Sequence, residues 1–236
     1  MTLGPSLNRP CLGGGRSEKY VEREGVRGES LVAINSGANM NFGRLAHVAE
    51  RAELGESQEA VLAVTIPERP GSFRRFCQAL GHRQITEFNY RFADPQEAHV
   101  FVGIQLNNGA TEKDEVIEEL RQQGYPVLDL TDDEMAKVHV RHMVGGRGHD
   151  RVENEIIYRF EFPERPGALL KFLTRMGMRW NISLFHYRNH GAAYGRVLVG
   201  VQVPEKQQVR FREFLDKVGF RFVEETDNPA YRLFLS

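Results

Sequence analysis

Apolar positions in the first half of the chain switch between two periods. Residues 61–66 form a β-branched, apolar run that ends at a proline, which predicts a strand. Residues 73–80 then carry apolar side chains at spacings of three and four, which predicts a helix with one apolar face. Pro70 suits the first turn of this helix and Gly81 suits its end.

Two strands, a second helix and a last strand follow. Residues 85–93 and 98–106 are typical of strands, with an Asp-Pro turn between them. Residues 111–123 have a helical apolar face, and residues 125–130 predict the last strand. The order βαββαβ indicates a ferredoxin-like unit, an antiparallel sheet covered on one face by two helices.

This pattern occurs twice. Residues 66–73, IPERPGSF, match residues 162–169, FPERPGAL, and 164 − 68 gives an offset of 96. Residues 85–91, ITEFNYR, match residues 182–188, ISLFHYR, at an offset of 97. A repeat of this length indicates two copies of one structural unit.

We therefore expect an α+β chain with two tandem ferredoxin-like domains, at residues 59–145 and 153–236. Each copy should end in a short helix. Thr131 and Glu134 have the spacing of a capping box, and Thr226 leads into an Asp-Asn-Pro sequence. Helix capping explains these acidic clusters without a catalytic role.

Composition narrows the function classes. The 236 residues are 41% hydrophobic and 27% charged, which is ordinary for a globular protein. The formal net charge is -1, so the chain offers no broad attraction to nucleic acid. No apolar run approaches the roughly 20 residues that a membrane-spanning helix needs. We expect neither nucleic acid nor membrane as a partner.

The cysteines and the N-terminal residues add little chemistry. Cys11 and Cys77 support neither a disulfide framework nor a cysteine metal site, which fits a reducing cytoplasm. Residues 1–17 are rich in glycine and proline and have no amphipathic pattern, so we interpret them as a disordered leader or a misassigned start.

Three segments resemble a known family. Residues 61–106, residues 131–147 (TDDEMAKVHVRHMVGGR) and residues 181–198 (NISLFHYRNHGAAYGRVL) are similar to the ACT-like regulatory half of biosynthetic threonine deaminase, also called threonine ammonia-lyase. The likeness covers roughly residues 18–236. Within it, residues 18–58 resemble the closing strand and connecting helix of the catalytic domain, a short strand-helix remnant.

The resemblance implies pyridoxal phosphate as the cofactor of the intact enzyme. Ser36 stands in a Ser-Gly-Ala-Asn turn whose serine contacts the pyridine nitrogen in that family. Catalysis also requires a lysine for the Schiff base. The six lysines lie in charge-rich helical or loop patterns, and none stands in the family's Ser-x-Lys-x-Arg-Gly setting. We expect no catalytic residue and no cofactor bound by this chain alone.

One glycine marks the expected ligand site of each copy. ACT-like domains commonly bind a small amino acid where the turn before the first helix meets the neighbouring domain. Gly71 and Gly167 stand at these helix starts, where a missing side chain admits close approach and unpaired N–H groups favour a carboxylate.

The resemblance also names the ligands and the contacting side chains. The family is inhibited by isoleucine, and valine opposes this effect. It implies that Tyr90 and Tyr187 contact the effector, supported by Arg91, Arg141 and Arg188. A tyrosine offers a ring wall and one hydroxyl group. The alternative is that both tyrosines only pack the sheet.

Other site classes are poorly supported. The third strand of each copy lacks the basic and aromatic residues that an RNA-recognition domain needs. His139 and His142, or His186 and His190, form single pairs without a carboxylate or cysteine at a familiar metal-ligand spacing. No Gly-x-Ser-x-Gly nucleophile motif occurs.

Three functional hypotheses therefore stand. The first is a non-catalytic regulatory region of threonine ammonia-lyase, which binds isoleucine and valine and acts through residues 43–60. The second is an incomplete gene model of the whole pyridoxal-phosphate enzyme, and the third is a stand-alone amino-acid-binding ACT module. Whether the chain is an enzyme stays open. We expect association as a homo-oligomer or with a catalytic subunit, in the cytoplasm, or in a plastid or mitochondrion of a eukaryote.

Overall fold

The structure is a computed structural model of the chain. It describes residues 23–25, 58–148, 152–163, 167–177, 179–189 and 194–236. Contacts divide the chain into two units, Met1–Ala52 and Glu53–Ser236, and every strand among the described residues lies in the second. The predicted leader and Ser36 lie outside the described residues, and of the strand-helix remnant only residues 23–25 and residue 58 are described.

Each copy has the predicted order of elements. The first copy contains β1 (Glu59–Pro67), α3 (Ser72–Ala79), β2 (Ile85–Arg91), β3 (Glu97–Gln105), α4 (Gly109–Gln122), β4 (Val127–Asp129), the π-helix η1 (Ala136–Val140) and α5 (Arg141–Met143). The second contains β5 (Glu155–Pro163), α6 (Ala168–Met176), β6 (Asn181–Arg188), β7 (Tyr194–Gln202), the 3-10 helix η2 (Glu205–Gln207), α7 (Gln208–Val218), β8 (Arg221–Glu224) and α8 (Pro229–Phe234). None of the helices in this part of the chain is long and apolar enough to cross a bilayer.

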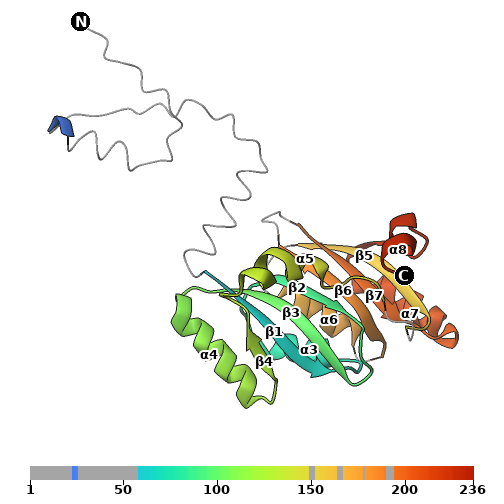
Figure 1. Cartoon of the computed structure of the whole chain (residues 1–236). Coiled ribbons are helices and arrows are strands. Elements are labelled where there is room, and N and C mark those ends of the chain that lie inside the picture. Colours follow the sequence, from blue (N-terminus) through green and yellow to red (C-terminus); the bar gives the residue numbers. More distant parts are fainter. Residues whose placement is uncertain (1–22, 26–57, 149–151, 164–166, 178, 190–193) are drawn as a thin grey trace, which may run out of the picture. The chain divides into compact units, whose positions relative to one another are not determined.

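The two copies share one antiparallel sheet of eight strands, in the order β4-β1-β3-β2-β6-β7-β5-β8 (Figure 1). The copies meet where β2 pairs with β6, a junction that we call the seam. In its register Tyr90 is opposite Phe185 and Phe88 is opposite Tyr187, so the two tyrosines occupy equivalent places on either side of its centre. The predicted fold class, α+β with tandem ferredoxin-like domains, is confirmed.

Aromatic rings form a core that crosses the seam. Phe185 of β6 lies 5.3 Å from Phe88 of β2 and 6.4 Å from Phe73 of α3, measured between ring centroids. Phe172 of α6 is also 6.4 Å from Phe185. Because all four rings are buried and belong to one core cluster, the copies fold as a single hydrophobic unit.

The opposite face of the sheet is covered by shorter elements. Val61 and Phe101 pack there with Ala136 of η1 in a second, small core cluster. Glu87 also faces this side and pairs with Arg141 of α5, whereas its neighbour Phe88 joins the main core. In Figure 1, α5 and α8 lie above the sheet on this face.

Several element boundaries differ from the prediction. The first helix begins at Ser72 instead of Pro70, because Gly71 precedes it with φ of 88° and interrupts the helical backbone. The last strand of the first copy contains only Val127–Asp129, not residues 125–130, although Pro126 and Leu130 on either side of it each form one backbone hydrogen bond with β1.

The predicted capping role of Thr131 is wrong. Its hydroxyl oxygen accepts a hydrogen bond of 3.1 Å from the amide of Val61 in β1. Thr226 has the same role in the second copy, accepting from the amide of Ile157 at 3.0 Å. Both threonines therefore complete the pairing of the first strand in their copy.

Other residues take the capping positions. Asp133 accepts from the amide of Ala136 at 2.9 Å, before η1. Asn228 accepts from the amide of Ala230 at 2.9 Å and caps α8, where Pro229 occupies the first turn.

Candidate functional site

The turn that precedes the first helix of each copy reaches the other copy. These turns end at Gly71 and Gly167, with φ of 88° and 79°. A left-handed backbone strains most residues with a side chain, so glycine is needed at both positions for conformational reasons. The first turn meets the start of β6, and the second turn meets the start of β2.

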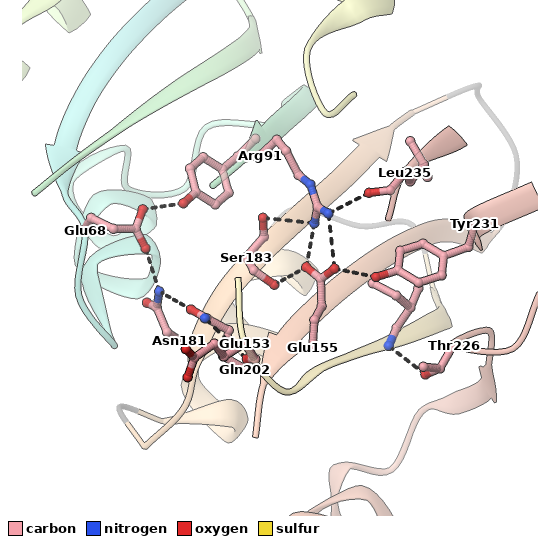
Figure 2. A network of polar contacts seen from close by, with 12 residues as sticks. Glu68, Arg91, Glu153, Glu155, Asn181, Ser183, Gln202, Thr226, Tyr231 and Leu235 are labelled. Atoms are coloured by element: carbon pink, nitrogen blue, oxygen red, sulfur yellow. Dashed lines mark hydrogen bonds and ion pairs between the residues drawn. The ribbon is translucent and has the colours of Figure 1, made fainter. Parts of the chain in front are cut away.

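A polar site lies at the first turn, and we call it the first turn site. Tyr90 of β2 is fully buried, and its hydroxyl donates to the Oε2 atom of Glu68. The Oε1 atom of Glu68 accepts a 2.6 Å hydrogen bond from Nδ2 of Asn181 in the second copy (Figure 2). Phe73 packs edge-on against the Tyr90 ring at 4.8 Å. Glu68 is therefore one polar link between the copies.

Two buried polar atoms at the first turn site have no hydrogen-bond partner among the described residues. They are the Oδ1 atom of Asn181 and the hydroxyl of Ser72. A buried polar atom without a partner is costly and commonly marks a place for water or a ligand. Both atoms belong to elements that flank Glu68.

Burial governs the ionisation of this site. It is the main cause that raises the pKa of the Glu68 carboxyl, while hydrogen bonds from Tyr90 and Asn181 oppose that shift. Burial, followed by the negative charge of Glu68, raises the pKa of Tyr90. Tyr90 therefore remains a neutral donor. A cationic group near Glu68 would favour the ionised form of the Glu68 carboxyl.

The second turn site is a small cavity between the copies. Its lining includes the turn and helix start of copy 2, together with the end of α3 and the start of β2 from copy 1. The lining residues are Cys77, Gly81, Arg83, Gln84, Ile85, Phe162, Gly167, Ala168, Leu169, Leu170 and Tyr187. Tyr187 is buried there and stacks on Phe162 at 6.1 Å.

The space in this cavity is about 20 Å³, enough for one water molecule. An amino acid would enter only after neighbouring atoms move apart. Turn residues 164–166 lie outside the described residues, so the counterpart of Glu68 is not placed. The structure thus brings Tyr187 and Gly167 to one cavity, and Tyr90 and Gly71 to the first turn.

The structure does not bring Arg91 to the tyrosines. Consecutive strand residues face opposite sides of a sheet, so Arg91 points away from the Tyr90 side. It forms a buried ion pair with Glu155 of the second copy, with N–O distances of 2.5 and 3.1 Å (Figure 2). It also donates to the carbonyl oxygen of Leu235 at 2.8 Å. Arg91 thereby ties the copies together.

Arg141 and Arg188 also lie on this far face. Arg141 is 4% exposed and donates to the Oε2 atom of Glu87 at 2.6 and 3.0 Å. Arg188 follows Tyr187 in β6 and is opposite Glu87 in the seam register. The expected support of the effector by the arginines therefore does not fit their positions.

Sequence reasoning missed Glu68 and Asn181. Glu68 stands inside the repeated Pro-Glu-Arg-Pro-Gly turn, so a signal existed. Asn181 is 113 residues away along the chain, and only the seam register shows that it is a neighbour. Within the described residues, no group of three or more His, Cys, Asp or Glu side chains could hold a metal ion.

Two ferredoxin-like units joined edge to edge, with a turn site on either side of the seam, have the arrangement of a tandem ACT-like regulatory region. A family model described as the C-terminal regulatory domain of threonine dehydratase matches the chain twice, at residues 50–140 and 146–235. The chain therefore belongs to this family.

Named relatives agree with this assignment. The chain is 56% identical over 217 residues to "L-threonine dehydratase biosynthetic IlvA" of Burkholderia multivorans, and 54% identical over 219 residues to the protein of that name in Escherichia coli. It is 44% identical over 220 residues to "Threonine dehydratase 1 biosynthetic, chloroplastic" of Solanum lycopersicum. These matches cover 92%, 93% and 93% of the chain, but only 42%, 42% and 36% of the relatives.

Proposed function

We propose that this chain senses branched-chain amino acids for a threonine dehydratase, the enzyme that converts threonine to 2-oxobutyrate and ammonia. Isoleucine is the proposed inhibitor, and valine is the proposed opposing ligand. The observation that carries the proposal is the first turn site, where a half-buried carboxylate, a tyrosine hydroxyl and two unpartnered polar atoms lie beside an aromatic wall.

This chemistry suits an α-amino acid. The ligand ammonium group would approach the Glu68 carboxylate and the unpartnered Oδ1 atom of Asn181. The ligand carboxylate would accept from the hydroxyl of Ser72 and from the first amides of α3. Phe73 and Tyr90 would contact the branched side chain, since effector pockets combine apolar walls with a few polar groups.

The second turn site is the weaker candidate of the two. Ala168 stands where the first copy has Ser72, and Gln84 stands where the second copy has Asn181. Its cavity is small and is lined by several apolar side chains. We therefore propose that isoleucine binds first beside Tyr90, and that Tyr187 contacts a ligand only after the second site opens.

Regulation requires a difference in affinity between states. Isoleucine would inhibit by binding the less active arrangement of the enzyme more tightly than the active one. Residues 43–60, which would transmit the change, and Ser36, the proposed remnant of the pyridoxal phosphate pocket, lie largely or wholly outside the described residues. We also propose assembly with a catalytic portion or as a homo-oligomer. The compartment would be the cytoplasm or, as the names of some relatives suggest, a chloroplast or mitochondrion.

Calorimetry on the full chain tests the binding proposal. Isoleucine should bind saturably, and 3-methylpentanoic acid, which lacks the ammonium group, should bind at least about tenfold more weakly. The variant E68Q should bind isoleucine more weakly than the wild type does. The difference in its affinity between isoleucine and 3-methylpentanoic acid should also be smaller. Absence of isoleucine heat and of any thermal shift would overturn the proposal.

Tyrosine variants separate the sites. Y90F should weaken isoleucine binding by about tenfold, because the Glu68 carboxylate loses the hydroxyl group that orients it in the site. Y187F should affect only a second, weaker binding event. Y194F is the matched control, since Tyr194 is 63% exposed and lies in neither site. Turnover of threonine by the pure chain with added pyridoxal phosphate would overturn the expectation that this chain alone is not catalytic.

A further inference from the structure

The second copy contains a groove that shares no lining residue with the second turn site. It lies between the end of α6 and α7 and has a volume of about 390 Å³. Its lining residues are Arg175, Met176, Gly177, Arg179, Trp180, Arg210, Glu213, Phe214 and Lys217. We call it the basic groove, because four of these residues are cationic and one is acidic.

Helix geometry explains two of the four cations. Arg175 and Lys217 stand in the last turns of α6 and α7, where positive charge complements the helix dipole. Arg175 is also engaged, because it donates to the carbonyl oxygen of Val218 and lies 5.3 Å from the centroid of Phe220. These two residues alone would not indicate a ligand.

Arg179 and Arg210 have no such explanation. Both side chains are exposed, and among the described residues neither forms an ion pair or hydrogen bond, with the nearby Glu213 or with any other residue. Both line the same groove from different elements, before β6 and within α7. Their guanidinium groups remain available to an anion.

The first copy shows that the fold does not require this charge. The counterpart of Arg179 is Arg83, which pairs with Glu119 at 3.0 Å. In the second copy Phe214 stands at the position of Glu119, so the neutralising carboxylate is replaced by a ring. The counterpart of Arg210 is Glu115, so the charge at that position is inverted.

The floor of the groove is aromatic. Trp180 is 4% exposed and its ring lies 4.9 Å from Phe211 and 5.4 Å from Phe214. Its Nε1 atom is buried and has no acceptor among the described residues. An anion oxygen in the groove would offer an acceptor to the indole N–H, as well as to the two guanidinium groups.

We propose that the basic groove binds a small phosphate monoester that carries a planar apolar group. Guanidinium forks match phosphate oxygens bidentately, and a phosphate dianion matches two unpaired cations better than a single carboxylate does. The aromatic floor accounts for the planar group. Free amino acids are poor ligands here, because the surrounding cations repel their ammonium group.

The single tryptophan makes the proposal directly measurable, because Trp180 lines the groove and its emission is not mixed with that of another tryptophan. The full chain is titrated with phenyl phosphate and with inorganic phosphate at constant ionic strength. Phenyl phosphate should change the emission saturably and bind about tenfold more tightly than phosphate. Equal affinities would overturn the aromatic part of the proposal, and no saturable change with either would overturn all of it.

Variants test the assignment to residues. R179Q/R210Q should weaken phenyl phosphate binding by about a hundredfold, because two charge-assisted contacts are lost. R212Q is the matched control, since Arg212 is exposed on α7 and does not line the groove. If the double variant fails to fold, F214E provides the second test, because it restores the first-copy arrangement and should neutralise Arg179. Unchanged affinity in a folded variant of either kind would overturn the proposal.

Discussion

The two copies share a backbone plan but differ in the chemistry that they present. Their strands, α-helices and bulges correspond, including a register shift near the start of β2 and of β6, whereas the π-helix η1 and the 3-10 helix η2 each occur in one copy. Their turn sites differ in polarity, and the faces of α4 and α7 differ in the sign of their charge. Buried apolar positions thus specify the fold in both copies, while positions facing a site or solvent are free to diverge.

The largest expected effect concerns the shared core. F185A removes a ring that contacts both copies, and it should lower the free energy of unfolding by about 3–5 kcal/mol. F222A, on the edge strand β8, should cost less because Phe222 is 38% exposed. Urea unfolding measures both. Equal costs would contradict a core that is continuous across the seam.

Next come the buried ion pairs, one between the copies and one within the first. R91M and R141M should each cost about 3–5 kcal/mol, because each leaves a buried glutamate without its partner. The double variant R91M/E155L should recover most of the loss. If R91M costs less than R141M by several kcal/mol, Arg91 does not hold the copies together as described.

Thr131 and Thr226 test a place where the copies are the same. T131V and T226V should each cost about 1–3 kcal/mol, because each leaves an amide of β1 or β5 without its acceptor. Thermal unfolding compares the two variants. A loss in only one copy would break the equivalence of these positions.

The smallest effect is a dependence on pH. The folded state raises the pKa of Glu68 above its ordinary value of 4.5, so the native chain holds this proton more tightly than the unfolded chain. The proton on Glu68 therefore contributes its full stabilisation of the folded state below pH 4.5, and this stabilisation is lost as the pH rises through the raised pKa. The glutamine in E68Q does not titrate, so this variant does not lose stability in this way as the pH rises. Its melting temperature should therefore gain on that of the wild type as the pH rises above 4.5, whereas parallel curves would contradict the raised pKa.

Periodicity predicted the elements of each copy because local apolar spacing reflects local structure. Strand alternation would also have separated Arg91 from Tyr90, since adjacent strand residues face opposite sides. The role of Thr131 could not be predicted from the sequence, because a threonine that caps a helix and a threonine that completes strand pairing occur in similar sequence patterns. Neither the partner of Glu68 nor the cations of the basic groove follow from spacing, since both depend on which elements the fold brings together.

The seam has a further consequence because it lies within one polypeptide. A pair of identical domains that associates from separate chains dissociates on dilution, and symmetry gives it two identical sites. Here the linker maintains a high effective concentration of each copy for the other, so the pairing does not depend on protein concentration. A substitution at either site also changes one site and not both. Gene duplication followed by fusion would thus allow one site to be tuned to one ligand while its counterpart acquired another.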